Sequence, residues 1–161
     1  MPNNENPEKR IARLEAIEEI RHLKARYCNA CDEKDPETVR QVFTDDALID
    51  AGPFGVHETP EAFVAVFEEF GCRPHIVDMH HLANPEIEVV SETEAEGLFA
   101  LYFYTMDLDE RTFRQMAGTY RDKYRLENGA WRIYHSVFAP HSVLDGTLDG
   151  EGHPLYHPQG V

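Results

Sequence analysis

The hydrophobic pattern of this chain changes its period once, close to Arg73. Before that residue, apolar side chains recur at every third or fourth position, which is typical of amphipathic helices. After it, stretches rich in Ile, Val, Phe, Tyr and Thr predict β-strands over residues 76–90, 95–108, 112–127 and 131–139. Helices followed by an antiparallel meander predict an α+β domain, in which a curved antiparallel sheet wraps around N-terminal helices and leaves an opening at one end.

Three helices are expected in the first half of the chain. The first covers about residues 8–34, because apolar side chains follow one helical face from Ile11 and Leu14 onward. Asp35-Pro36 and Thr59-Pro60 each predict a helix start, since an N-cap oxygen precedes a proline at the first helical position. The second helix is expected to bury Val39, Val42 and Phe43, and the third to bury Phe63, Val66, Phe67 and Phe70, with Gly71 as a left-handed stop.

Turn residues mark the connections between the predicted strands. Asn128-Gly129 predicts a tight hairpin, because both residues tolerate positive φ angles. A short strand is expected over residues 47–50, followed by a turn at residues 52–55. One domain is therefore expected over residues 1–140, and the Gly-, Pro- and His-rich residues 141–161 are expected to form an extended tail.

The charge balance limits the partners of this protein. Fifteen Lys and Arg against thirty Asp and Glu give a net charge of -15, which disfavours nucleic acid and anionic membrane surfaces. The opening segment lacks the apolar core of a secretory signal, and no apolar run is long enough to span a bilayer. We therefore expect a cytoplasmic protein, in which Cys28 and Cys31 pack within the first helix and form neither a redox pair nor a zinc site.

Asp32 and His80 are the candidates for acid–base chemistry. Proton abstraction at neutral pH needs a base that titrates near neutrality, and a histidine supplies it when a carboxylate fixes its tautomer and stabilises the imidazolium. Taken one at a time, Asp32 is also consistent with an ordinary acid at a helix end, and His80 with an ordinary hydrogen-bonded side chain.

Three segments carry a resemblance to a known family: residues 26–35 (RYCNACDEKD), residues 80–89 (HHLANPEIEV) and residues 118–133. Over residues 8–140 the chain resembles the SnoaL-like branch of the NTF2-like superfamily. The resemblance implies a cone-shaped fold, made by a bent antiparallel sheet around helices. It also implies an activity similar to that of scytalone dehydratase, bile-acid 7α-dehydratase and hexachlorocyclohexane dehydrochlorinase, which are cofactor-free lyases with an Asp–His pair.

The same resemblance implies roles for three residues. The aspartate of the family falls on Asp32, and its histidine falls on His80, 48 residues later by the difference of 80 and 32. His80 would be the base, and Asp32 would orient it. Tyr27 would polarise a substrate carbonyl or assist the departing oxygen, with a place in the apolar stripe of the helix as the alternative. His80 and His81 point to opposite faces of a strand, so only one of them can face the interior.

This chain departs from its relatives at several positions. Cys31 and Ala51 stand where scytalone dehydratase carries the tyrosines that hold its catalytic water, so scytalone is not expected as the substrate. Thr105 stands near the second histidine of that enzyme, and Phe103 near a further aspartate of the bile-acid enzyme. The weaker candidates for the substrate pocket, each also consistent with a core or sheet-face position, are Tyr102, Tyr104, Tyr120, Phe54 and His81. In the resembling enzymes the tail covers the pocket, which makes the tail of this chain a candidate lid.

The expected function is that of a lyase that eliminates water or another leaving group from a small hydrophobic, cyclic or polycyclic substrate without a cofactor. An isomerase with the same base and a noncatalytic ligand-binding or assembly module are the alternatives, because a fold does not fix a function. No metal is expected, and the rival site would draw two histidines and a carboxylate from His75, His80, His81, His135, His141 and Asp78. The exposed face of the sheet favours a homodimer or a homotrimer.

Overall fold

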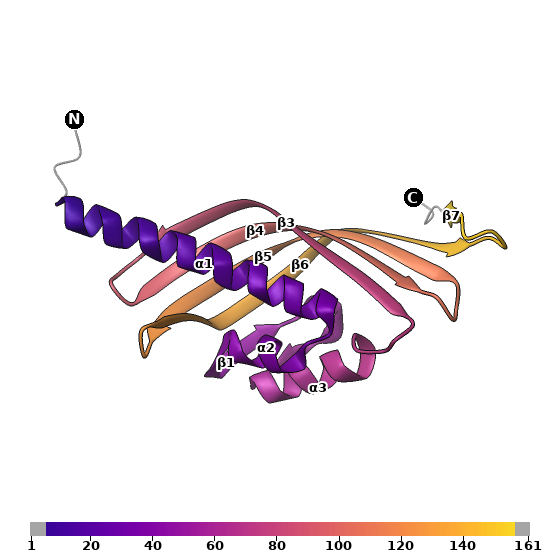
Figure 1. Ribbon diagram of the computed structural model, residues 1–161, viewed down its shortest axis with the longest axis horizontal. Coiled ribbons are helices and arrows are strands. Elements are labelled where there is room, and N and C mark those ends of the chain that lie inside the picture. The colour runs from indigo at the N-terminus through magenta and orange to yellow at the C-terminus, as the bar shows by residue number, and fades with distance from the viewer. Residues whose placement is uncertain (1–5, 157–161) are drawn as a thin grey trace.

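The first helix, α1, spans Pro7–Glu33 in the computed structural model, which describes residues 6–156 (Figure 1). The Asn6 side chain caps its start by accepting a hydrogen bond from the N–H of Glu8 at 3.1 Å. The helix ends at Lys34, which takes the left-handed conformation with a φ of 60°. The helix expected over residues 8–34 is therefore confirmed.

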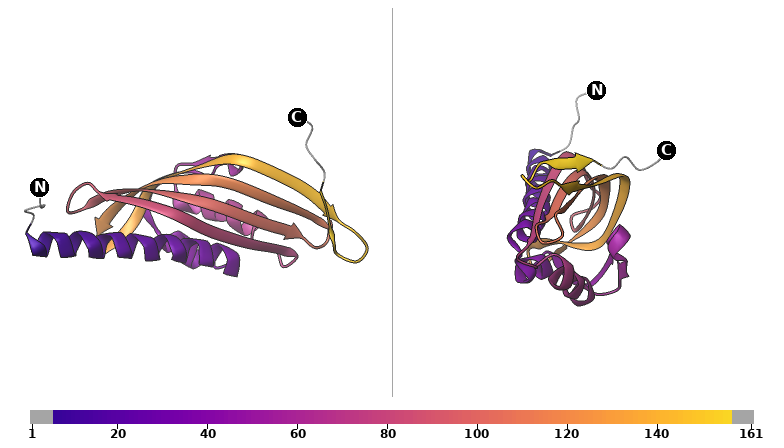
Figure 2. Two further views of the ribbon diagram at one scale, coloured as in Figure 1. Left: turned by 90° about the horizontal axis from the view of Figure 1, so that it is seen from above. Right: turned by 90° about the vertical axis from the view of Figure 1, so that its right-hand side faces the viewer.

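The apolar stripe of α1 is buried only from the middle of the helix onward. Ile20 and Cys31 are buried, whereas Ile11 and Leu14 are 55% and 61% exposed. Figure 2 shows the reason, because the N-terminal end of α1 projects past the end of the sheet. The helical period is therefore correct along the whole stripe, but the sheet covers only part of it.

The second helix, α2, spans Pro36–Gln41 and is capped by the Asp35 side chain, as predicted. It ends before Phe43, which the helical pattern assigns to its buried face. Phe43 instead begins strand β1 (Phe43–Asp50) and pairs with Ile133, far away in sequence. Pairing with a distant strand thus overrides the local helical pattern.

The third helix, α3, spans Pro60–Phe70. The Thr59 side chain caps it by accepting a hydrogen bond from the N–H of Ala62 at 3.3 Å, which confirms the predicted start. The left-handed stop at Gly71 is wrong, because this residue has a φ of -88°. A Cβ at Gly71 would lie 2.8 Å from the ring of Phe67, so close packing requires the glycine there.

Within residues 6–156, all strands belong to one sheet of seven, whose order is β2-β1-β6-β5-β4-β3, with β7 paired to β6. Neighbouring strands are antiparallel except β1 and β6, which run parallel, so the sheet is mixed where a purely antiparallel one was expected. Parallel neighbours need a long crossover connection, which α3 and the strands between β1 and β6 provide. The other elements are the 3₁₀ turn η1 (Gly52–Phe54), β2 (Val56–His57), β3 (Ile76–Val89), β4 (Glu94–Asp107), β5 (Thr112–Glu127), β6 (Ala130–Leu148) and β7 (Pro154–Tyr156).

The predicted boundaries of β3, β4 and β5 hold within one residue. The hairpin between β5 and β6 is also confirmed, since Asn128 and Gly129 have φ angles of 52° and 78°. Strand β6, by contrast, does not end near residue 139 but continues to Leu148 and forms a hairpin with β7. Residues 157–161, the end of the expected tail, lie outside the described residues.

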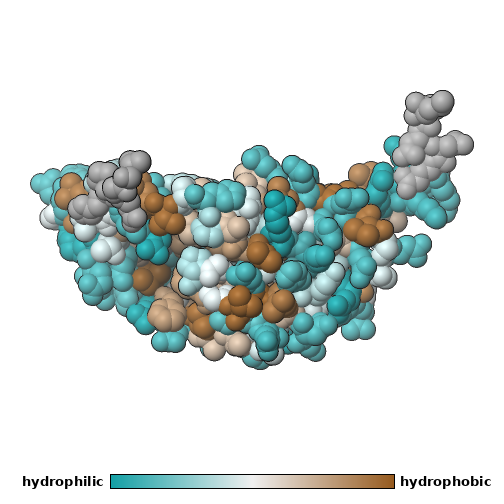
Figure 3. Space-filling view, turned by 180° about the vertical axis from the view of Figure 1, so that it is seen from behind, coloured by the Kyte–Doolittle hydropathy of each residue, from teal (hydrophilic) through white to brown (hydrophobic). Residues whose placement is uncertain are grey.

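The concave face of the curved sheet packs against the helices. In Figure 1, α1 crosses the sheet, while α2 and α3 lie beside β1 at one end. The core lies between these layers, and its fully buried side chains include Ile20, Tyr124 and Ile133. This arrangement confirms the α+β cone. The exposed surface mixes polar and apolar side chains (Figure 3), and no helix within residues 6–156 has the length and apolarity needed to cross a membrane.

Candidate active site

An apolar cavity of about 230 Å³ lies between α3 and the concave face of the sheet. Most of its lining surface is apolar, and six phenylalanines form much of its wall: Phe54, Phe63, Phe67, Phe70, Phe103 and Phe138. An apolar cavity with a small number of convergent polar groups is typical of a site for a small molecule. The cavity is open space, so the aromatic side chains line this end of the cone without filling it.

His80 and Asp32 meet at the wall of this cavity. The Nδ1 atom of His80 lies 2.6 Å from Oδ1 of Asp32, and the backbone N–H of His80 donates to Oδ2 at 3.0 Å. The two side chains are only 13% and 18% exposed. An ionised carboxylate accepts hydrogen bonds and cannot donate them, so Nδ1 of His80 is the donor in this contact. In the neutral imidazole this contact leaves Nε2 as the acceptor, which is the tautomer that a general base needs.

The ends of two elements set this geometry. Asp32 lies in the last turn of α1, which the left-handed Lys34 closes. His80 occupies an inward position of β3 opposite Phe103, and the two rings lie 4.5 Å apart. Because the α1 terminus packs against β3, the carboxylate reaches both the ring and the backbone of one residue.

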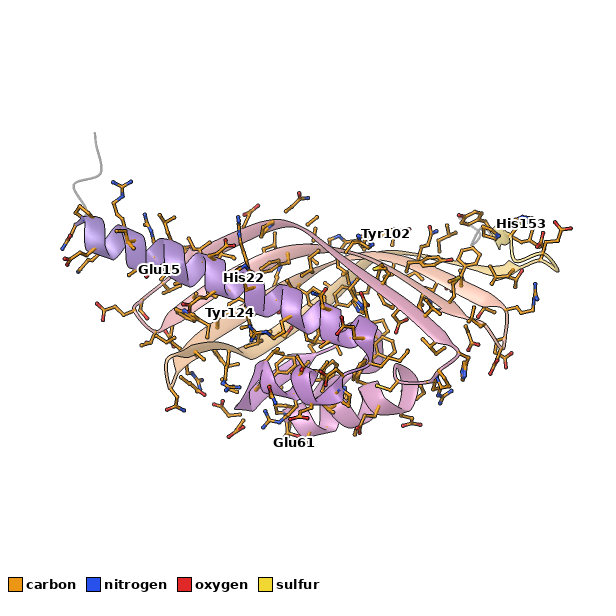
Figure 4. All side chains as sticks on the ribbon, viewed as in Figure 1. Glu15, His22, Glu61, Tyr102, Tyr124 and His153 are labelled. Atoms are coloured by element: carbon orange, nitrogen blue, oxygen red, sulfur yellow. The ribbon has the colours of Figure 1, made fainter. Side chains whose placement is uncertain are left out.

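The neighbouring histidine and two of the tyrosine candidates lie on the other face of the sheet. His81 is opposite Tyr102 in the register of β3 and β4, and Tyr102 is 47% exposed on the side away from α3 (Figure 4). Tyr104, two residues on, packs against Phe113 with the ring centroids 6.3 Å apart. The structure therefore does not bring His81, Tyr102 or Tyr104 to the cavity, because alternation along β4 points Phe103 inward.

Tyr27 and Tyr120 do line the cavity, as does Phe54. The rings of the two tyrosines stand edge to face, 6.2 Å apart, and their hydroxyls are hydrogen-bonded to each other. Burial raises the pKa of both phenols well above the ordinary value, so both stay protonated at neutral pH. Tyr27 is also hydrogen-bonded to the thiol of Cys31. The two phenols therefore share their hydrogen bonds with each other and with this thiol.

A buried ion pair beneath these phenols was missed by sequence reasoning. Nζ of Lys24 lies 2.8 Å from Oδ2 of Asp122 and 3.5 Å from the ring centroid of Tyr120. Asp122 also accepts hydrogen bonds from the hydroxyls of Tyr124 at 2.9 Å and Ser136 at 2.6 Å. Figure 4 shows Tyr124 beside α1. The sequence does contain a signal for this ion pair. Lys24 lies within the apolar stripe of the first helix, and Asp122 lies between the inward-facing Tyr120 and Tyr124 on β5.

Asp78, Thr105 and Arg114 also line the cavity, and Arg114 is paired through two of its nitrogens with the carboxylate of Asp145. Sequence reasoning named Asp78 only as a possible metal ligand and Thr105 only as standing near a histidine of a relative, and it missed Arg114. Within residues 6–156, no three His, Cys, Asp or Glu side chains gather as metal ligands would. Burial raises the pKa of the Cys28 thiol to about 12, so this thiol stays protonated.

Comparisons with known proteins agree with this architecture. The crystal structure of a hexachlorocyclohexane dehydrochlorinase, LinA type 2, superposes with a TM-score of 0.77 at 17% identity, covering 94% of this chain and 99% of the other. LinA type 3 from Novosphingobium barchaimii gives a TM-score of 0.74 at 18% identity, covering 87% and 94%. A scytalone dehydratase candidate from Novosphingobium aromaticivorans gives 0.74 at 22% identity, covering 81% and 87%.

The TM-scores of these superpositions establish a shared fold, and at such low identities they establish no more than the fold. A search of curated protein sequences finds no match. The sequence itself matches the family model of the SnoaL-like domain over residues 12–147, which is most of the chain. The match agrees with the resemblance carried by the segments around Asp32 and His80, and the cone-shaped fold is the one that this resemblance implies. The chain therefore belongs to the SnoaL-like family.

Proposed function

We propose that this protein is a lyase that eliminates water or another small leaving group from a hydrophobic, cyclic or polycyclic substrate, with His80 as the base. The observation that carries the proposal is the His80–Asp32 pair at the wall of an apolar cavity. Structures with the same fold include proteins named for dehydration and for dehydrochlorination, and both reactions are eliminations.

The first step of the proposed reaction is removal of a proton from carbon. Nε2 of His80 takes this proton, and the imidazolium that forms is stabilised by the Asp32 carboxylate 2.6 Å from Nδ1. A carbon next to a carbonyl is acidic enough for such a base only when the developing enolate is stabilised. Tyr27 and Tyr120 line the cavity and stay protonated, so their phenols are the candidate donors to that oxygen.

The second step expels the leaving group. The electron pair of the enolate forms the carbon–carbon double bond, and the bond from the next carbon to the leaving group breaks. The phenylalanine-rich wall accommodates the ring system of the substrate and keeps bulk water from the enolate. A cyclic ketone with a leaving group on the second carbon from the carbonyl matches these surroundings.

The test measures elimination from cyclic β-hydroxy ketones with one ring and with two fused rings, and from hexachlorocyclohexane. Formation of the enone is followed by absorbance, and loss of the leaving group by mass spectrometry. His80→Gln is expected to lower kcat by about 10²- to 10⁴-fold, the usual contribution of a general base. Asp32→Asn is expected to lower it as well, because an amide can present a donor to Nδ1 and so favour the other tautomer.

The control is His81→Gln, which removes the adjacent histidine on the opposite face of the same strand. It is expected to leave kcat unchanged. Turnover that is equal in the parent and in His80→Gln would contradict the role of the base. A product that keeps the leaving group but has a shifted double bond would point to an isomerase. Binding of the ketones without turnover would favour a ligand-binding module.

A further inference from the structure

The carboxyl group of Asp78 reaches the same cavity, and the reaction described so far does not use it. Asp78 lies two residues before His80 on β3, and both side chains line the cavity. Residues i and i+2 of a strand point to the same face and lie about 7 Å apart. Asp78 is directly opposite Thr105 on β4, whose hydroxyl donates a hydrogen bond to it. Its position is therefore fixed beside the base.

Asp78 differs in its partners from Asp32, which holds His80, and from Asp50, which also lines the cavity. Asp32 is held by two hydrogen bonds from His80, and Asp50 accepts one from the backbone N–H of Gly52 at 3.0 Å. Among the described residues, no lysine or arginine lies within ion-pair distance of Asp78. The hydroxyl of Thr105 is a neutral donor, which stabilises a carboxylate less than a cation does.

The charged and titratable groups around Asp78 come from several elements. Asp32 and Lys34 lie at the end of α1, Cys72 lies after α3, His80 lies on β3 and Arg114 lies on β5. Nζ of Lys34 is committed to the carbonyl of Gly71 at 2.6 Å, and Arg114 to Asp145. Burial is the largest influence, and it raises the pKa of Asp78, with a smaller rise from the Asp32 carboxylate and opposing effects of Thr105, His80 and Lys34.

We propose that Asp78 is the catalytic acid of this site and protonates the leaving oxygen, an inference that rests on the proposed function. His80 takes the proton from carbon, and the carbon–carbon double bond forms. The carbon–oxygen bond breaks with its electron pair on oxygen, and the proton of the Asp78 carboxyl group moves to that oxygen, which leaves as water. His80 is then an imidazolium and Asp78 a carboxylate, and proton exchange with solvent restores both.

This assignment narrows the substrate class. Hydroxide is a poor leaving group, so its departure needs a proton, whereas chloride or a carboxylate leaves as an anion without one. A partly buried carboxylic acid beside the base therefore favours hydroxylated substrates and dehydration. The phenols of Tyr27 and Tyr120 remain for the carbonyl oxygen, because Asp78 serves the oxygen that departs.

The experiment compares two probes that differ only in the leaving group, a cyclic β-hydroxy ketone and its acetate ester. Acetate leaves without protonation. Asp78→Asn is expected to lower kcat/KM for the hydroxy ketone by about 10²- to 10³-fold, and for the acetate by less than about tenfold. His80→Gln is expected to lower both. Glu86→Gln, a charge-removing change at an exposed position of the same strand, is expected to lower neither.

The outcomes separate the two proposals. Equal effects of Asp78→Asn on both probes, including no effect on either, overturn the role of Asp78 and leave that of His80 intact. Elimination of neither probe by the parent, or elimination that is insensitive to His80→Gln, overturns the proposed function itself. Asp78→Glu keeps an acid on a longer side chain, so partial recovery of dehydration by this variant supports proton donation over a purely structural role.

Discussion

At the scale of single residues, the candidate site depends on how one carboxylate is shared. Both oxygens of Asp32 are taken by His80, one by the ring and one by the backbone N–H. This arrangement fixes the imidazole in two ways, because the ring cannot rotate without losing the shorter contact, and the backbone contact holds the carboxylate on β3. Asp78 has no partner of this kind, and burial raises its pKa above the ordinary value. Asp32 and Asp78 therefore differ in the partners that hold their carboxyl groups.

Asp78→Asn should change how the free energy of unfolding depends on pH. Burial raises the pKa of Asp78 above its ordinary value of 3.8, so the folded protein binds this proton more tightly than the unfolded chain. The resulting stabilisation is complete at a pH below the pKa of Asp78 in the unfolded chain. It is lost as the pH rises through the raised pKa of Asp78 in the folded protein. The variant, which cannot ionise there, should gain stability relative to the parent as the pH rises above about 4.

Urea unfolding at several pH values between acid and neutral measures this difference. Glu86→Gln is the control, because an exposed carboxylate has nearly the same surroundings in the folded and unfolded chain. A stability difference between Asp78→Asn and the parent that stays constant with pH would contradict the raised pKa.

At the scale of elements, the buried pair of Lys24 and Asp122 joins α1 to β5. The pair is 1% and 0% exposed, and Asp122 also receives two hydroxyl donors. A buried pair of this kind fixes how the helix lies on the sheet, since any other register would leave two charges unpaired. Lys24 of the same pair packs against the ring of Tyr120, which lines the cavity, so the pair also holds a cavity-lining side chain in place.

Lys24→Met should therefore lower the free energy of unfolding by about 3–5 kcal/mol, because it leaves the Asp122 carboxylate buried without a cation. The double change Lys24→Met with Asp122→Leu should recover much of this loss, since no buried charge remains. The control is Lys123→Met. Lys123 is next to Asp122 in the sequence but forms an exposed ion pair with Glu96, so its replacement should leave the free energy of unfolding nearly unchanged. Chemical denaturation of the four proteins measures these differences. A double variant no more stable than Lys24→Met would contradict the explanation.

At the scale of the whole molecule, the cone gives its cavity two unlike walls. The polar wall is β3, which carries both His80 and Asp78, and the apolar wall includes Phe63, Phe67 and Phe70 of α3. A substrate ring held between these walls meets the base and the acid from the same side. The homodimer or homotrimer expected from the exposed sheet face stays a prediction.

This arrangement predicts syn elimination. In a cyclic β-hydroxy ketone with deuterium on the carbon next to the carbonyl, the label cis to the hydroxyl should be lost, because His80 and Asp78 act from one strand face. Mass spectrometry of the enone from the cis- and trans-labelled ketones distinguishes the two cases. Loss of the trans label would show that the proton and the oxygen leave from opposite faces, which contradicts joint action from β3.

Short-range patterns in the sequence predict much of the local structure and identify two candidate residues for acid–base chemistry. Caps at Asp35 and Thr59, the Asn128-Gly129 turn and the alternation along the later strands act over a few positions, so they can be recognised without a partner. Asp32 and His80 were identifiable because the residues around them resemble a family.

Only the tertiary structure decided which faces meet. Alternation shows that Phe103 and Tyr104 point apart, but the packing of α1 and α3 decides that Phe103 faces the cavity. Phe43 has a helical pattern, yet its pairing with β6 makes it part of a strand. Alternation along β3 places Asp78 on the same face as His80, but the cavity that both residues line, like the burial of Lys24, depends on contacts between segments far apart in the chain. Hydrophobic periodicity shows which side chains share one face of a helix or strand. Burial and strand pairing also depend on the second element that packs against that face.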